Sequence, residues 1–332
     1  MQIFGSETGQ TREHRFSSIT SRVLLYLKLV AGHLGRYSNN FAWWYTFLMS
    51  QEWPKGATEP VIQDFKKSEI TSSRIHTTTL DRPKISEVER EQTEKELKKL
   101  GELMGDSDVW WQLDGTLTAS LREIKHGGDY IGAHSDIDIS VLRSELPKLE
   151  QYLKEKGYGL FLISRNGDQR TFRRVGYKVF SSRSLNGVRE APYIAAMDEQ
   201  GNIRIDADLV RVQVAIVDID TDSNPSERGV NYPKSWLEGE TVTVNGVPII
   251  LSHPARHLFF KIWQTRGYDE KDIDLIAQMN LLTNKDLDTL ENIVLSKAAD
   301  PAWWEENKHY VKDDSVLRSR LAKLRKHLTE KN

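Results

Sequence analysis

The stretch LDGTLTASLREIKHGGDYIGAHSDIDISV, residues Leu113–Val141, decides which fold this chain is expected to adopt. An apolar strand leads into a turn at Asp114-Gly115, and apolar residues then recur at helical spacing over Thr116–Lys125. A glycine-rich loop follows, and the alternation of polar and apolar residues over Asp136–Val141 predicts another strand. The stretch therefore predicts a strand, a helix, a loop and a strand in succession.

Two aspartates alternate with isoleucines at the start of this last strand. Successive side chains of a strand point to opposite faces, so Asp136 and Asp138 project together while Ile137 and Ile139 enter the core. The Cα atoms of such a pair lie about 6 to 7 Å apart, which lets the carboxylates share a hard divalent cation. Asp136 and Asp138 are therefore the predicted metal ligands, for Mg²⁺ or Mn²⁺. The alternative is the ordinary solvated face of an amphipathic sheet.

The same alternation recurs in IRIDADLVRV, residues Ile203–Val212, where Asp206 and Asp208 share one face. If this strand lies beside the first, three or four carboxylates converge, which is the arrangement that a two-metal phosphoryl-transfer site requires. Asp208 is the predicted third carboxylate, with Asp206 as the alternative. This carboxylate would bind the shared metal or act as general base for an acceptor hydroxyl.

The turn before the helix predicts a phosphate site. A Gly-Thr pair that ends a strand and opens a helix exposes backbone N–H groups to an anion, so Gly115 and Thr116 are predicted to hold a donor phosphate. Arg122 lies one or two turns into the helix and is predicted to reach the same phosphates. An ordinary turn at Asp114-Gly115 is the alternative.

The composition is typical of a soluble globular protein of about two domains: 332 residues, of which 38% are hydrophobic and 28% charged. The chain has no cysteine, which excludes disulfides and thiolate metal sites. We expect an N-terminal helical segment over 1–53, a connector over 54–83, a catalytic core over 84–252 and a C-terminal helical region over 253–332. Strands and helices mixed in this way predict the α+β class.

Net charge and the N-terminal segment indicate where the protein acts. A formal net charge of −2 argues against nucleic acid as a partner. The apolar run Val23–Ala31 is too short to span a membrane, because a spanning helix needs about 20 apolar residues. Residues 16–53 are rich in aromatic side chains, so peripheral membrane contact is an alternative to helical packing for this segment. We expect a cytoplasmic protein, either free or peripherally bound to a membrane.

The order of these residues resembles the nucleotidyltransferase (polymerase-beta-like) fold superfamily. In that pattern a Gly-Ser or Gly-Thr turn precedes an Asp-x-Asp strand, and a third carboxylate follows on a later strand. The most similar pattern within it is that of the LicD/fukutin family, D-G-T-L-L-G-A-V-R-H-x-G-F-I-P-W-D-D-D-I-D. The matching residues are Asp114, Gly115, Thr116, Leu117, Arg122, His126, Gly128, Ile131, Asp136 and Asp138. The resemblance implies a mixed β-sheet flanked by helices, and it adds Asp114 and His126 to the predicted substrate-binding residues.

The resemblance implies two kinds of reaction. LicD-like proteins use Mg²⁺ to transfer a phospho-alcohol, such as phosphocholine or ribitol phosphate, from a CDP-linked donor to a sugar hydroxyl. A second element, with Lys261, Arg266, Lys271, Asp272 and Asp274, is similar to the K…R…KD…D element of small nucleotidyltransferases of the antibiotic-modifying and toxin kinds. Those relatives transfer a nucleoside monophosphate from an NTP to a hydroxyl of a small molecule or protein. A pseudoenzyme that binds a nucleotide or glycan without turnover is the third reading.

Overall fold

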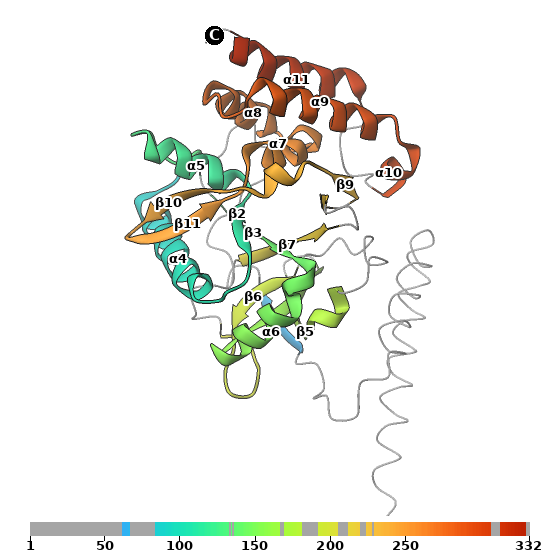
Figure 1. The fold of residues 1–332 in the computed structure, drawn as a ribbon. Helices are drawn as coiled ribbons and strands as arrows, with labels where there is room; N and C mark the ends of the chain where they lie inside the picture. The colour runs from blue at the N-terminus through green and yellow to red at the C-terminus, as the bar shows by residue number, and fades with distance from the viewer. Residues whose placement is uncertain are drawn as a thin grey trace, which may run out of the picture. The chain divides into compact units, whose positions relative to one another are not determined.

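One mixed β-sheet runs through the part of the chain that the computed structural model describes (Figure 1). The strands follow the order β1-β5-β4-β6-β7-β3-β2-β11-β10, and β8 and β9 extend from β7. β3 is parallel to β7 and β11 is parallel to β2, whereas the other neighbours are antiparallel. The strands are β1 (Ile62–Lys66), β2 (Trp111–Asp114), β3 (Ile137–Leu142), β4 (Tyr158–Asn166), β5 (Gln169–Val175), β6 (Tyr193–Ala196), β7 (Val212–Ile219), β8 (Pro225–Glu227), β9 (Val230–Asn231), β10 (Glu240–Val244) and β11 (Val247–Leu251).

Several predictions concern residues that the structure does not describe. The predicted N-terminal helical segment, its membrane contact, and both Asp206 and Asp208 lie outside the described residues. None of the described helices is long and apolar enough to cross a membrane. The described residues are 62–66, 84–132, 134, 136–166, 169–180, 192–204, 212–219, 224–227, 229–306 and 313–329.

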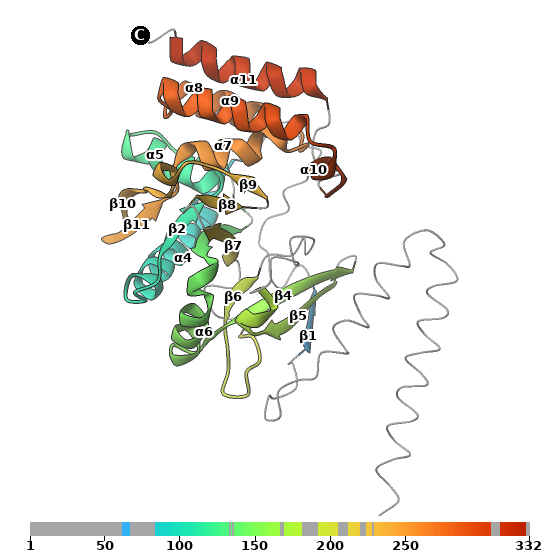
Figure 2. The ribbon, with the colours of Figure 1, turned by 45° about the vertical axis from the view of Figure 1, so that its right-hand side comes forward.

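Helices flank the sheet, and the C-terminal helices form a further layer of their own. Apolar residues of α4 and α6 form one hydrophobic cluster with β2, β3, β7 and β11. The C-terminal helices share a second cluster, in which α11 packs on α8 and α9 (Figures 1 and 2). The helices are α4 (Glu87–Gly105), α5 (Thr116–Lys125), α6 (Leu146–Glu155), α7 (Pro254–Trp263), α8 (Asp269–Gln278), α9 (Asn284–Ala298), α10 (Pro301–Glu306) and α11 (Asp314–Thr329).

Local sequence explains where the elements around the central turn begin and end. Helix α4 starts at a capping box, in which the Ser86 hydroxyl accepts from the Glu89 N–H and the Glu89 carboxylate accepts from the Ser86 N–H. Gly115, at φ +73°, stands between β2 and α5, because only glycine adopts this backbone conformation without strain. The predicted helix over Thr116–Lys125 has the bounds that were expected from its periodicity.

The alternation along β3 separates the core from the site. Ile137 and Ile139 are buried in the cluster shared with α4 and α6. Asp138 and Ser140 therefore face the opposite side, toward the C-terminal helices. On β7, Val212 and Val214 follow the core face in the same way. The sheet thus has an apolar face that packs against α4 and α6. On the opposite face, its central strands carry polar side chains.

The fold class is confirmed, and the predicted domain boundaries stay a prediction. The protein has an α+β fold with a mixed sheet flanked by helices, and its described C-terminal region is helical. Strand β1 lies within the predicted connector 54–83 and pairs with β5, because Ile62 meets Arg173 in the antiparallel register. Pro60–Asn332 forms one compact unit. Helix α7, the first helix of the C-terminal region, contacts α5 of the core as well as α8 and α9.

Candidate active site

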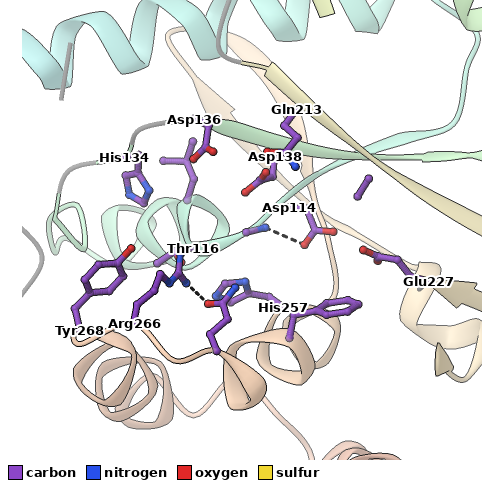
Figure 3. A pocket seen from close by; sticks show the side chains of 15 residues that line it. Asp114, Thr116, His134, Asp136, Asp138, Gln213, Glu227, His257, Arg266 and Tyr268 are labelled. Carbon is purple, nitrogen blue, oxygen red and sulfur yellow. Dashed lines mark hydrogen bonds between the residues drawn. The ribbon is translucent and has the colours of Figure 1, made fainter. Parts of the chain in front are cut away.

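A cavity of about 260 Å³ opens where the polar face of the sheet meets helices α5 and α7 (Figure 3). Its walls come from six separate parts of the chain: the β2–α5 turn, β3 and the loop before it, β7, β8, α7, and the segment after α7. The lining residues are Asp114, Gly115, Thr116, Leu117, His134, Asp136, Asp138, Gln213, Ala215, Glu227, His257, Phe260, Gln264, Arg266 and Tyr268.

The predicted metal ligands share one wall of this cavity. Asp136 and Asp138 are half-buried, and both carboxylates project into the cavity from the beginning of β3 (Figure 3). On the neighbouring strand β7, the residue in register with Asp138 is Gln213, whose side chain also lines the cavity. The described part of β7 therefore places an amide, and not a carboxylate, beside the aspartate pair. The predicted third carboxylate, Asp208 or Asp206, stays a prediction.

The Gly115 turn is packed directly against Asp138. A β-carbon on Gly115 would lie 2.6 Å from Oδ2 of Asp138, so the turn and the carboxylate require glycine at this position. Gly115, Thr116 and Leu117 line the cavity at the N-terminus of α5, which has no side-chain cap. The first N–H groups of a helix and its dipole favour an anion at this end. The structure thus brings Gly115 and Thr116, the predicted phosphate residues, next to the predicted metal ligands.

Asp114 holds the turn in place by accepting four hydrogen bonds. Its Oδ1 accepts from the Gly115 N–H at 2.9 Å and from the Ser252 hydroxyl at 2.9 Å. Its Oδ2 accepts from the Ser140 hydroxyl at 2.6 Å and from Nη2 of Arg256 at 3.2 Å. Burial opposes ionisation of Asp114, but Arg256 and these donors outweigh it, so the pKa of Asp114 lies below its ordinary value. Asp114 lines the cavity, and all four of these bonds join its carboxylate to the protein itself. Its predicted role in substrate binding stays a prediction.

Arg122 and His126 are not among the lining residues of this cavity, and their predicted roles in substrate binding stay predictions. Arg122 is buried at 3% exposure, where Nε donates to Glu240 at 2.9 Å and Nη2 donates to the Ser252 carbonyl at 2.8 Å. His126 is exposed and follows the last residue of α5, whereas the cavity lies at the first. A helix of this length spans about 15 Å. Helical spacing placed Arg122 on a face of α5, but that face packs against the β10–β11 hairpin and not against the site.

The cavity contains functional candidates that the sequence did not single out. His134 is buried beside Ser120, whose hydroxyl lies 3.2 Å from Nε2 of His134 and accepts from the Ile131 N–H at 2.9 Å. Glu227 and His257 enter from β8 and α7. A weak signal existed for His134, which lies two residues before Asp136. No local pattern marks Glu227 or His257, because they approach the site only through tertiary packing.

Arg266 supplies positive charge at the side of the cavity opposite Glu227 (Figure 3). Its Nε and Nη2 contact Oδ1 of Asp269 at 3.1 and 2.9 Å, and its guanidinium lies 4.9 Å from the ring of Tyr268. The fully buried Lys261 forms ion pairs with Asp269, at 2.9 Å, and with Asp272. Burial opposes the charge on Asp269, yet Lys261 and Arg266 lower its pKa. The buried Lys261–Asp269 pair thus fixes Arg266 at the cavity.

The residues present fit a hard divalent cation. Mg²⁺ is commonly held by one or two carboxylates and completes its octahedral shell with water and substrate phosphate. Asp136 and Asp138 supply two carboxylates beside a helix N-terminus that favours phosphate. Among the described residues, no group of three or more His, Asp or Glu side chains has the spacing of a metal site. The ion would therefore depend on the donor phosphate or water for its other ligands.

Comparisons with known proteins add little to this geometry. No protein-family model matches the chain, and no curated protein matches it. Among solved structures, the chain is similar to an antigenic nucleotidyltransferase-like protein from Paracoccidioides brasiliensis. The identity is 15%, the TM-score is 0.35, and the match covers 69% of this chain and 97% of that chain. A likeness at this level assigns no family, so the function must be inferred from the site.

Proposed function

We propose that this protein is a metal-dependent transferase that moves a phosphorus-containing group from a nucleotide donor to a hydroxyl of an acceptor. The observation that carries the proposal is the contact between the Gly115 turn and the Asp138 carboxylate at one cavity. It puts a helix N-terminus, which favours an anion, beside two carboxylates, Asp136 and Asp138, which would suit a divalent cation. A phosphate with a bound divalent cation needs both at once.

The cavity walls support different parts of such a reaction. The N–H groups at the start of α5 and the guanidinium of Arg266 would bind and orient the donor phosphates. Asp136 and Asp138 would hold Mg²⁺ or Mn²⁺, which, when bound, neutralises the charge that develops on the transferred group. Catalysis of this kind depends mainly on positioning and charge neutralisation. Asp208, or Asp206, remains the predicted third ligand or general base.

One observation favours an NTP over a CDP-linked donor. Arg266, from the element that is similar to small nucleotidyltransferases, lines the cavity. Arg122 and His126, which belong to the LicD-like motif, lie outside it. We therefore favour transfer of a nucleoside monophosphate from an NTP to a hydroxyl of a small molecule, glycan or protein. Transfer of phosphocholine or an alditol phosphate from a CDP-linked donor is the second candidate, supported by the order of residues from Asp114 to Asp138.

The donor class can be tested by thermal unfolding of the full chain with Mg²⁺ and single nucleotides. We expect ATP, GTP, CTP or UTP to raise the melting temperature, and CDP-choline and CDP-ribitol to have little effect. Stabilisation by the CDP-alcohols alone would support the LicD-type reaction instead. A protein that is stabilised by nucleotide but never consumes it, with any acceptor tried, would be a binding protein without turnover.

The metal role can be tested with Asp136→Asn and Asp138→Asn. Each variant should lose turnover by about 100-fold or more, because removing a preorganised charge at the transferring group costs roughly 3 kcal/mol or more. The expected change in folding stability is small. Asp288→Asn, an exposed aspartate of α9, is the matched control and should react at the wild-type rate. Full turnover in both Asp136 and Asp138 variants with Mg²⁺ present would exclude the proposed metal site.

A further inference from the structure

Four carboxylates line the cavity, and two of them lie directly opposite each other. Asp114 on β2 is in antiparallel register with Asp138 on β3, so both side chains project from the same face. Asp136 adds a third carboxylate and Glu227 a fourth. Like charges at directly opposed strand positions destabilise a sheet. A cavity with this many acidic groups therefore needs a positive charge near it before any ligand binds.

Arg256 places such a charge behind the wall formed by two of these carboxylates. It comes from the first turns of α7, is 2% exposed, and its Nη2 contacts Oδ2 of Asp114 at 3.2 Å and Oε2 of Glu227 at 3.3 Å. The same nitrogen donates to the Ser140 hydroxyl at 2.6 Å, and Nη1 donates to Gln112 at 2.9 Å. Buried ion pairs need such extra hydrogen bonds to offset their desolvation.

The ring of Tyr232 completes the enclosure of this guanidinium. Its centroid lies 5.4 Å from Cζ of Arg256, and Tyr232 is itself buried. The planar guanidinium is thus fixed by two carboxylates, two neutral acceptors and an aromatic face. Its charge occupies a permanent position beside Asp114 and Glu227.

We propose that Arg256 is a built-in counter-ion that neutralises Asp114 and Glu227 and keeps both carboxylates from binding a metal ion. The described cavity then binds one divalent cation, at Asp136 and Asp138. In a two-metal site, three or four carboxylates hold a pair of ions. Here a guanidinium takes the place of the second ion. Arg256 contacts neither the cavity nor, in this proposal, the substrate, and it acts as a positioning residue. The proposal rests on the proposed function only in requiring that the cavity bind a metal ion.

The test is a titration of the full chain with Mn²⁺, followed by electron paramagnetic resonance of the unbound ion, without nucleotide. The wild type should bind a single Mn²⁺. Asp138→Asn should weaken that binding by about 10-fold or more, since a lost ligand matters at least as much as a lost supporting contact. Glu227→Gln, an isosteric change that removes a nearby charge but no ligand, should weaken Mn²⁺ binding much less than Asp138→Asn does. If Glu227→Gln weakens binding as much as Asp138→Asn does, Glu227 is a ligand and the proposal is wrong.

Replacing Arg256 separates its charge from its shape. Arg256→Met removes the charge and should create a second Mn²⁺ site, because Asp114 and Glu227 are no longer neutralised. Arg256→Lys keeps the charge and should still bind a single ion. Two Mn²⁺ ions in the wild type, or no second ion in a folded Arg256→Met variant, would overturn the proposal. If Arg256→Met does not fold, the Glu227→Gln arm decides. A wild type that binds no Mn²⁺ would overturn this proposal and would also remove the metal from the proposed function, whereas two bound ions would overturn this proposal alone.

Discussion

Gly115 combines a backbone constraint and a steric one. Its φ of +73° strains any residue with a β-carbon, and that carbon would meet Oδ2 of Asp138 at 2.6 Å. We expect Gly115→Ala to lower the free energy of unfolding by about 1–3 kcal/mol through backbone strain. It should also displace the Asp138 carboxylate and weaken Mn²⁺ binding. Denaturant unfolding and the Mn²⁺ titration measure the two effects.

Gly127→Ala provides the matched control for this change. Gly127 has a φ of +86°, but a β-carbon there would meet nothing within 4 Å. The substitution should therefore reproduce the backbone strain of Gly115→Ala without its effect on Mn²⁺. Equal Mn²⁺ affinities in the two variants would mean that the contact between Gly115 and Asp138 is unimportant for the site.

Asp114 should make the folded state sensitive to acid. Its folded pKa is lowered from an unfolded value of about 3.9, chiefly because Arg256 and its hydrogen-bond donors outweigh burial. Ionised Asp114 therefore stabilises the protein fully above the unfolded pKa, and this contribution is lost as pH falls through the folded pKa. We expect the stability difference between wild type and Asp114→Asn to be constant from about pH 7 to 5 and to shrink below about pH 4. A difference that stays constant at lower pH would contradict this.

At the scale of elements, α7 connects the sheet to the C-terminal helices through buried charges. Lys261 has no exposed surface and pairs with Asp269 and Asp272 at the start of α8. Lys261→Met would remove the buried charge that Asp269 and Asp272 share, although Arg266 still contacts Asp269, and it should destabilise the protein by about 3–5 kcal/mol. Lys271→Met, at an exposed position of α8, should change stability by less than about 0.5 kcal/mol. Denaturant unfolding distinguishes the two, and equal losses would contradict a specific role for Lys261.

The elements around the opening stretch could be predicted because their signals are local. Helix α5 and strand β3 follow from periodicity, and the shared face of Asp136 and Asp138 follows from strand alternation alone. The contacts that complete the site are not local. Arg256 lies 142 residues from Asp114 and 29 from Glu227. The contact of Arg122 with Glu240 is likewise not local, because the two residues are 118 positions apart.

At the scale of the whole molecule, the edge strand β1 sets a practical boundary. A fragment that begins at Pro60 keeps β1, whereas one that begins at Lys84 removes it and exposes the backbone groups of β5. Unpaired edges favour association with other chains. We expect fragment 60–332 to be monomeric and to unfold cooperatively, and fragment 84–332 to associate at high concentration. Sedimentation velocity measures this, and identical behaviour would show that β1 does not protect the sheet.

The cavity walls come from distant parts of the chain, and this affects when the site can form during synthesis. Its walls extend along the chain from Asp114 to Tyr268, and the counter-ion Arg256 is near the end of that range. At a synthesis rate of about 5–20 residues per second, roughly 8–30 s separate the first wall from the last. During that interval the growing chain already contains Asp114 and Asp138 but does not yet contain Arg256, whose guanidinium neutralises Asp114 in the folded protein. The β2–β3 pair should therefore become stable only when α7 arrives, which makes the site one of the last parts of the protein to form.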